Sequence, residues 1–131
     1  MSIEAHITVI STFPDDETGK KATSQLKKSL QDNEHELATA LHALNPIEDQ
    51  SDYLEETINV ENISRKKKIL TIIAYTYSKE QPIWYAQSLY ELGAIKVFIR
   101  GIWDDYGQNF YILNGKKVTK KNMQEINQKN L

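Results

Sequence analysis

The chain has 131 residues, no cysteine, and a formal net charge of −2 from 16 basic and 18 acidic residues. Its length predicts one domain over residues 1–131, and 40% hydrophobic against 26% charged residues predicts a folded chain. The lack of cysteine excludes disulfides, thiolate metal sites and cysteine nucleophiles, and the slightly acidic balance argues against direct nucleic-acid binding, which uses a basic surface.

The amino-terminal segment MSIEAHITVISTF predicts a strand and no targeting signal. It lacks a basic region and is too short and too polar for a signal peptide or a membrane span, so we expect a cytoplasmic protein with no membrane partner. Apolar residues at alternate positions from Ile3 to Val9 predict a half-buried strand. Pro14, Asp15 and Asp16 end this strand and favour the start of a helix.

Apolar residues recur at helical spacing between Ala22 and Leu44. They fall on one stripe about 100° wide, which comprises Ala22, Leu26, Leu30, Leu37, Ala40, Leu41 and Leu44. The phase is kept across residues 31–33, which predicts one long helix or two nearly coaxial helices. Because Asn33 with Glu36 can cap a second helix, the sequence leaves open whether residues 16–44 form one helix or two.

Acidic residues dominate the stretch from Ile47 to Ile63, which holds six carboxylates and no basic residue. Alternating apolar residues from Leu54 to Val60 predict a strand with an acidic outer face here. A connection through residues 64–66 leads to the next apolar run, so we expect an antiparallel hairpin. A solvated face explains the acidic run as well as a basic partner does, and both explanations stay open.

The run from Ile69 to Tyr77 is apolar at nearly every position, which predicts a central strand with both faces covered. A helix follows, with Pro82 in its first turn and Gly93 at its end. Its predicted buried stripe is Ile83, Tyr85, Ala86, Leu89, Tyr90 and Leu92, and Gln87, Ser88 and Glu91 lie opposite.

Trp84 departs from this helical pattern. It falls on the arc of Gln87, Ser88 and Glu91, so the helix is predicted to point it outward. It either covers a neighbouring loop or anchors a partner, because tryptophan is enriched among interface hot spots.

The rest of the chain predicts two more strands and a helix. Residues 95–99 alternate as a strand whose second face is partly wet. Asp104-Asp105-Tyr106-Gly107 indicates a turn, and residues 110–113 form the next strand. Asn114-Gly115 favours a tight hairpin, and Thr119 can cap a short last helix.

This order of elements predicts an α+β protein. We expect a ferredoxin-like βαββαβ antiparallel sheet with the helices on one face, extended by a carboxy-terminal β-hairpin and a short helix.

No residue pattern indicates a reaction, a cofactor or a metal. The five glycines are isolated, which excludes a phosphate-binding loop. His35 and His42 lie about 10 Å apart along a helix with no ligand-type residue between them on that arc. His6 is predicted on the sheet face opposite the helices, beside Thr8, Lys96 and Arg100. We therefore expect a protein that is not an enzyme.

The segment from Gly101 to Tyr111, GIWDDYGQNFY, followed by NGKKVTKK from Asn114, suggests a family. It resembles carboxy-terminal segments of small bacterial immunity proteins, which neutralise polymorphic toxins, including those of contact-dependent growth inhibition systems. The resemblance covers about the last third of the chain. It implies direct binding of a cognate toxin domain, often over the basic active site of a nuclease.

Our leading hypothesis is thus a non-enzymatic immunity protein that occludes the active site of a toxin, and the alternative is a small-ligand-binding or regulatory ferredoxin-like domain. The oligomeric state stays open. The candidate partner-binding residues are carboxylates that resemble nucleic-acid charge, and aromatic anchors: Asp52, Glu55, Glu56, Asp104 and Asp105, with Trp84, Trp103 and Tyr106.

Overall fold

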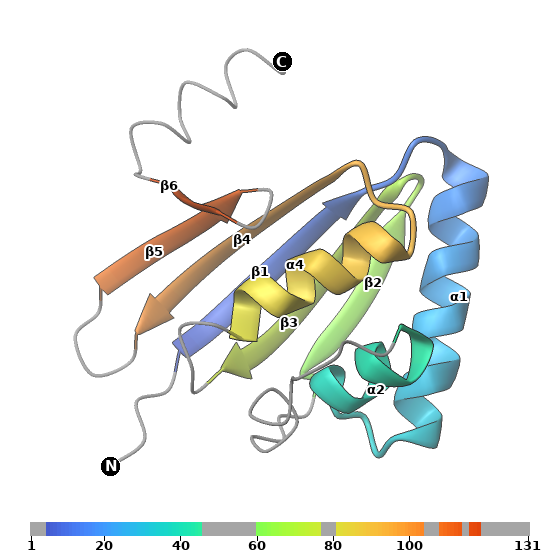
Figure 1. Cartoon of the computed structure of the whole chain (residues 1–131), viewed down its shortest axis with the longest axis horizontal. Coiled ribbons are helices and arrows are strands. Elements are labelled where there is room, and N and C mark those ends of the chain that lie inside the picture. Colours follow the sequence, from blue (N-terminus) through green and yellow to red (C-terminus); the bar gives the residue numbers. More distant parts are fainter. Residues whose placement is uncertain (1–4, 46–59, 77–80, 104–107, 114–115, 119–131) are drawn as a thin grey trace.

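The computed structural model describes residues 5–45, 60–76, 81–103, 108–113 and 116–118. Figure 1 shows an antiparallel sheet with helices packed on one face, so the predicted α+β class is confirmed. The elements are β1 (Ala5–Thr12), α1 (Asp16–Asp32), α2 (Leu37–Leu44), β2 (Asn62–Lys66), β3 (Ile69–Thr76), α4 (Gln81–Glu91), β4 (Lys96–Trp103), β5 (Gln108–Leu113) and β6 (Lys116–Val118).

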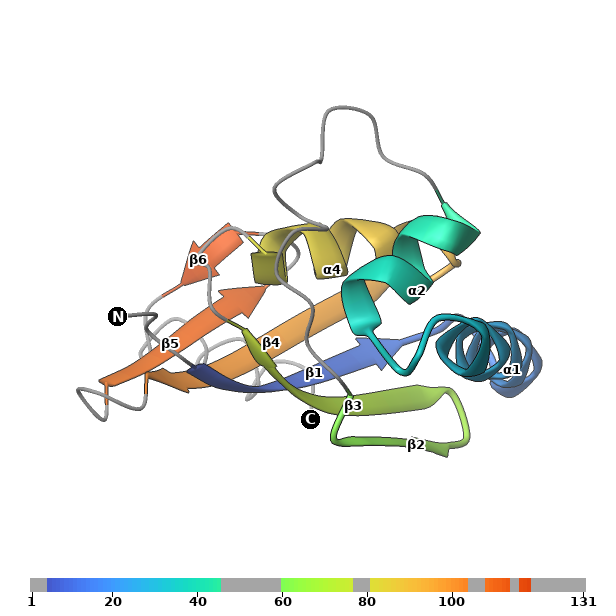
Figure 2. The same cartoon turned by 90° about the horizontal axis from the view of Figure 1, so that it is seen from below.

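The strands form one sheet in the order β2-β3-β1-β4-β5-β6, and every neighbouring pair is antiparallel. The first strand is therefore internal, between β3 and β4. Helices α2 and α4 lie over one face, and α1 runs along the side of the sheet that β2 borders (Figures 1 and 2). The predicted carboxy-terminal hairpin is confirmed by the pairing of β5 with β6, whereas the predicted last helix lies outside the described residues.

Residues 16–44 form two helices that are not coaxial. The Ser29 hydroxyl donates a hydrogen bond of 2.7 Å to the Ala40 carbonyl, two groups that a continuous helix would hold about 16 Å apart. The chain reverses at Glu34 and His35, whose φ angles are 57° and 63°. The buried stripe keeps its phase because both helices turn their apolar residues toward the same core.

The predicted capping role of Asn33 is wrong. Asn33 closes α1, with its side-chain amide donating to the Ser29 carbonyl at 2.7 Å and its backbone N–H to the Leu30 carbonyl at 3.2 Å. The N-cap of α2 is Glu36, and its carboxylate accepts a hydrogen bond from the Thr39 hydroxyl at 3.1 Å.

Strand β2 comprises residues 62–66, of which residues 64–66 are predicted to be a connection. The strand predicted from Leu54 to Val60 lies outside the described residues except for Val60, which is not in a strand. The predicted hairpin with β3 is confirmed, with a two-residue turn at Lys67 and Lys68. The strand is polar because Arg65, on its helix-facing side, reaches α1, where its guanidinium lies 2.7 Å from the Asp16 carboxylate.

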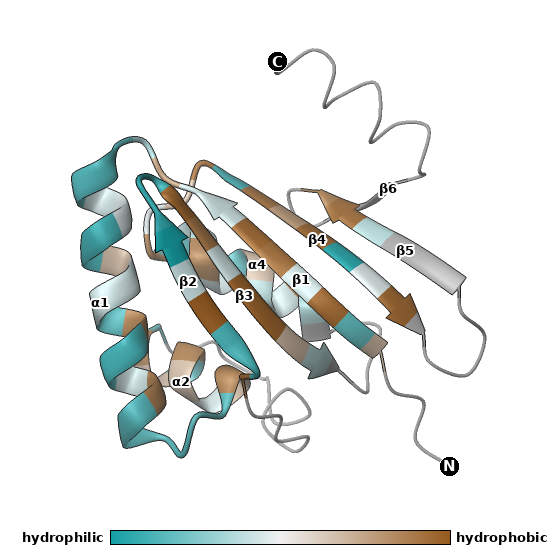
Figure 3. Ribbon diagram, turned by 180° about the vertical axis from the view of Figure 1, so that it is seen from behind, coloured by the Kyte–Doolittle hydropathy of each residue, from teal (hydrophilic) through white to brown (hydrophobic). Residues whose placement is uncertain are grey.

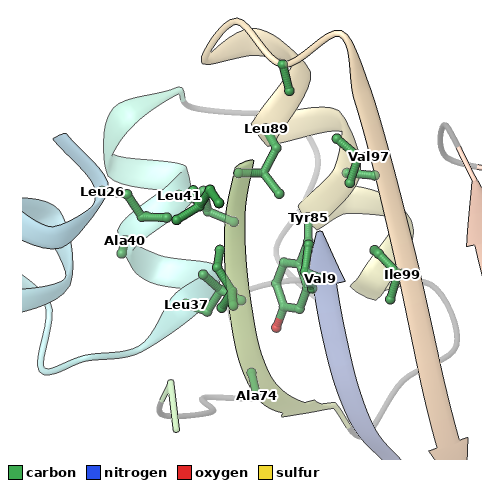
Figure 4. Packing of buried hydrophobic residues seen from close by; sticks show 14 of the residues in the cluster. Val9, Leu26, Leu37, Ala40, Leu41, Ala74, Tyr85, Leu89, Val97 and Ile99 are labelled. Atoms are coloured by element: carbon green, nitrogen blue, oxygen red, sulfur yellow. The ribbon is translucent and has the colours of Figure 1, made fainter. Parts of the chain in front are cut away.

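The core lies between one face of the sheet and the three helices. Leu26, Leu37 and Leu41 are fully buried and meet Tyr85 and Leu89 of α4 there (Figure 4). The rest of the predicted stripe from Ala22 to Leu41 is buried as well.

The prediction that both faces of the central strand are covered is wrong. Leu70, Ile72 and Ala74 of β3 are fully buried, whereas Ile69 is 41% exposed and Ile73 is half-buried. The described helices pack on one face alone, so the other face of the strands is open, as Figure 3 shows from behind. Apart from Leu113, its apolar residues are β-branched or aromatic, types that suit a half-exposed pleated surface.

Helix α4 buries a wider arc than its sequence predicts. Ser88, expected on the solvent side, is fully buried, and Trp84 is half-buried against the core. Helix α2 packs beside α4 and covers this flank (Figure 2). The prediction that Trp84 points outward is therefore wrong. Gly93, with φ 112°, follows the helix end as expected.

Two buried serines offer a direct comparison. The Ser88 hydroxyl has no hydrogen-bond partner among the described residues, whereas the Ser29 hydroxyl has one. We expect Ser88→Ala to raise the free energy of unfolding by about 1 kcal/mol, because it removes an unsatisfied buried group, and Ser29→Ala to lower it by about 1–2 kcal/mol. Chemical denaturation of both variants measures the difference. A loss of stability for Ser88→Ala contradicts the prediction.

Candidate functional surfaces

The structure contains two surfaces with side chains suited to binding. One is a groove between the ends of the helices, and the other is the face of the sheet that no described helix covers. We call the first the acidic groove and the second the open face.

The acidic groove has a volume of about 600 Å³. It lies where the first turns of α1 meet the carboxy-terminal ends of α2 and α4. Its lining comprises Asp15, Glu17, Thr18, Lys21, Ala22, Gln25, Leu44, Asn45, Glu91 and Leu92. Three carboxylates against one lysine give the groove an acidic character.

Local folding explains part of this charge. Asp15 is the N-cap of α1, and its carboxylate accepts a hydrogen bond of 2.7 Å from the Thr18 backbone N–H. Glu17 lies in the first turn, where the helix dipole favours negative charge. Glu91, at the other side of the groove, ends α4, a position where the dipole disfavours a carboxylate. Helix stability therefore does not account for Glu91.

The cap makes stability depend on pH. The hydrogen bonds from Thr18 hold the pKa of Asp15 below its ordinary value of 3.8. A lowered carboxyl pKa adds stability above the unfolded-state pKa, and this contribution is lost as the pH falls through the folded-state pKa. We expect Asp15→Ala to melt at a lower temperature than the unmodified protein at neutral pH.

The difference in melting temperature should shrink as the pH falls below 3.8. Asp15→Asn is the matched control, because asparagine keeps the capping oxygen and removes the titration. Thermal melts of the three proteins between neutral and acidic pH measure the effect. An unchanged difference down to the lowest pH contradicts the prediction.

The open face consists of the outward side chains of β1 to β5. The pairing register sets them in rows across the sheet. One row runs Lys66, Ile69, Thr12, Lys96; the next runs Ser64, Thr71, Ile10, Phe98, Leu113; a third runs Asn62, Ile73, Thr8, Arg100, Tyr111; and a fourth runs Tyr75, His6, Ile102.

Aromatic rings occupy both ends of this face. Phe98 and Tyr111 lie with their ring planes 6° apart and their centroids separated by 6.3 Å. His6 lies 4.9 Å from the ring of Tyr75 and 3.2 Å from the carboxylate of Glu61. These side chains are half-buried, apart from the exposed Glu61, so their ring faces are partly available to a ligand.

The charge of the sheet differs from that of the whole chain. The six strands contain no aspartate and no glutamate, but six lysines and arginines. Strands are generally poor in acidic residues, yet lysine is also depleted in them, so the strand preference alone does not explain the asymmetry.

Four residues predicted to lie on the face opposite the helices are found there. His6, Thr8, Lys96 and Arg100 lie on the open face as predicted. Sequence reasoning left out Tyr75 and Tyr111, although their positions in the alternation of β3 and β5 place them on this face. The apolar run from Ile69 to Tyr77 instead predicts that Tyr75 is covered on both sides of the strand.

Most of the predicted partner-binding residues fall outside the described residues, namely Asp52, Glu55, Glu56, Asp104, Asp105 and Tyr106. Trp103 is the last residue of β4 and pairs with Ala5 and Gln108. The described part of the chain brings Trp84 and Trp103 onto separate elements, α4 and β4.

Comparison of the chain with protein-family models, curated proteins and solved structures finds no match. Among the described helices, none has the length and apolar character needed to cross a membrane. In the same ranges, no three histidine or carboxylate side chains come together as a metal site would require.

Proposed function

We propose that this protein binds and neutralises a cognate bacterial toxin, as an immunity protein does, and catalyses no reaction itself. The observation that carries the proposal is the acidic groove. Its lining residue Asn45 is followed directly by residues 46–59, which add Glu48, Asp49, Asp52, Glu55 and Glu56 to the same part of the sequence. The carboxylates of the groove and of this segment together suit a basic partner.

Charge complementarity explains why such a surface is useful. A nuclease toxin must bind a polyanion, so the surface around its active site is basic. Opposing carboxylates speed the encounter and fix the orientation of the complex. The aromatic residues Trp103 and Tyr106 remain candidate anchors, since tryptophan and tyrosine contribute strongly at interfaces.

We propose further that the first four strands and their helices form a ferredoxin-like unit. Their spatial order, β4-β1-β3-β2, with antiparallel neighbours and helices on one face supports this assignment. Such a unit gives the groove a stable frame, because α1, α2 and α4 all pack on one core.

The test is binding to the toxin domain encoded beside this protein. We expect co-expression to protect cells, and the purified proteins to form a complex that weakens as salt is raised. Reversing two groove charges together, Glu17→Lys with Glu91→Lys, should weaken the complex by at least about tenfold.

The matched control is Asp32→Lys, which also reverses an exposed carboxylate on α1 but lies about 22 Å from Glu17 along the helix. It should leave the affinity unchanged. If co-expression gives no protection and no salt-sensitive complex forms, the proposal is excluded. If Asp32→Lys weakens the complex as much as the groove variant does, the groove is not the binding surface.

A second candidate function is a small-ligand-binding or regulatory domain that uses the open face. It is favoured by the position of His6, Lys96 and Arg100 on that face. A metabolite that binds the folded protein raises its melting temperature. A panel of anionic metabolites tests this candidate, and an unchanged melting temperature across the panel counts against it.

A further inference from the structure

We propose that the open face binds single-stranded nucleic acid, with aromatic rings stacking on bases and cations contacting phosphates. The proposal rests on the second candidate function, for which it names the ligand class, and does not depend on toxin binding. The net charge of −2 argues against a nucleic-acid ligand only if charge is evenly spread. It is not: the described outward side chains of the open face include Lys66, Lys96 and Arg100, and a carboxylate at one end of this face, that of Glu61, lies 3.2 Å from His6.

The outward residues of β4 alternate cations with an aromatic ring. On the open face this strand presents Lys96, Phe98 and Arg100 at two-residue intervals. The Phe98 position therefore lies between two cationic positions, each about 7 Å away along the strand. Lys96 and Phe98 are half-buried and Arg100 is exposed. A single nucleic-acid strand bound along these residues can stack a base on the Phe98 ring, and its phosphates can contact the flanking cations.

Neighbouring strands extend this pattern. Tyr111 pairs with Arg100 across β4 and β5, and its ring is parallel to that of Phe98. On the far side, Tyr75 and His6 form a second aromatic pair. Between the two pairs lie Thr8, whose hydroxyl can donate or accept hydrogen bonds, and the cation Arg100. The face thus offers two aromatic platforms with a hydroxyl group and a cation between them.

The geometry disfavours other occupants. A second copy docked face to face about a two-fold axis near β4 would bring Lys96 and Arg100 toward the same cations of its twin, and the like charges would repel. A duplex keeps its bases paired and stacked, so the base faces are not available to the aromatic rings of the sheet. An unpaired strand exposes the base faces that the rings need.

The experiment measures fluorescence anisotropy of a labelled oligouridylate or oligothymidylate of about 12 nucleotides with the full-length protein. At about 50 mM salt we expect saturable binding that weakens steeply as salt is raised. An unlabelled duplex should compete poorly. The absence of binding at about 100 µM protein, or equal competition by a duplex, overturns the proposal.

Variants locate the site. Arg100→Gln and Phe98→Leu should each weaken binding by about fivefold or more, since one loses a phosphate contact and the other a stacking ring. Lys28→Gln, on the exposed side of α1, removes the same charge as Arg100→Gln and should have little effect. If Lys28→Gln and Arg100→Gln lower the affinity for the oligonucleotide equally, the open face is not the binding site.

Circular dichroism melts confirm that each variant is folded. Because Phe98 is half-buried, Phe98→Leu keeps an apolar side chain there, and Tyr75→Leu provides a second ring deletion at the other aromatic pair. If both ring deletions leave the affinity of the folded protein unchanged, stacking is excluded and the proposal fails. Since no toxin is present, this result leaves the toxin-binding proposal standing.

Discussion

Replacing Leu41 with alanine is expected to lower the free energy of unfolding by about 3 kcal/mol. Leu41 is fully buried where α2 meets α1 and α4. A helix as short as α2 is not stable alone, so its position depends on this packing. The substitution leaves a cavity that the tightly packed neighbours cannot fill.

Urea denaturation followed by circular dichroism measures this loss. Ile95→Ala is the matched control, because it removes a similar amount of hydrocarbon from a side chain that is 61% exposed. We expect the control to change the free energy of unfolding by no more than about 0.5 kcal/mol. A loss below about 1 kcal/mol for Leu41→Ala would show that α2 contributes little to the folded state.

Replacing Gly19 with valine is expected to lower the free energy of unfolding by about 2 kcal/mol. A Cβ atom built at Gly19 would lie 3.2 Å from Lys68 Cα and 3.3 Å from the Lys67 carbonyl oxygen. These are backbone atoms of the β2–β3 turn, and the Phe13 N–H holds the turn by a hydrogen bond of 2.9 Å to the Lys68 carbonyl. Neither helix α1 nor the β2–β3 turn can therefore shift freely to make room for the added side chain.

Ser24→Val provides the control for this substitution. Ser24 is exposed on the same helix, and serine and valine have similar helix propensities, so this change should be nearly neutral. Thermal and urea denaturation of both variants give the comparison. If Gly19→Val is as stable as Ser24→Val, the close approach of α1 to the turn is not needed for stability.

Hydrophobic periodicity predicted the elements well where burial is one-sided. The stripe from Ala22 to Leu41 faces the core over two helices, and the register of β1 follows the alternation of its sequence. Periodicity missed the reversal at Glu34 and His35 because neither residue type signals a left-handed backbone as glycine does. Tertiary packing of α2 against α1 imposes that turn.

Two further errors have physical causes. A run of apolar residues in β3 was expected to be covered on both sides, yet a half-exposed face tolerates isoleucine and tyrosine. Residues 64–66 are polar and therefore predicted to be a connection, yet they belong to β2, where Arg65 takes a core-facing position through its ion pair with Asp16. In both cases the outcome depends on contacts between segments that are distant in sequence, and a local sequence pattern does not contain this information.

The candidate surfaces were predictable in part. The alternation of β1 and β4 placed His6, Thr8, Lys96 and Arg100 together. The acidic groove was not foreseen, because Glu17 and Glu91 are distant in sequence and line one groove only in the folded chain. The candidate carboxylates Asp52, Glu55 and Glu56 remain predictions.

The internal position of β1 has a consequence for synthesis. Ala5 pairs with Thr76 on one side and with Trp103 on the other, so the strand made earliest needs partners made much later. At ribosomal speed β1 waits on the order of several seconds for β4. Meanwhile, the local β2–β3 hairpin can form in microseconds. We therefore expect nascent chains that end before β4 to aggregate or to require a chaperone, because one apolar strand is left without its neighbour.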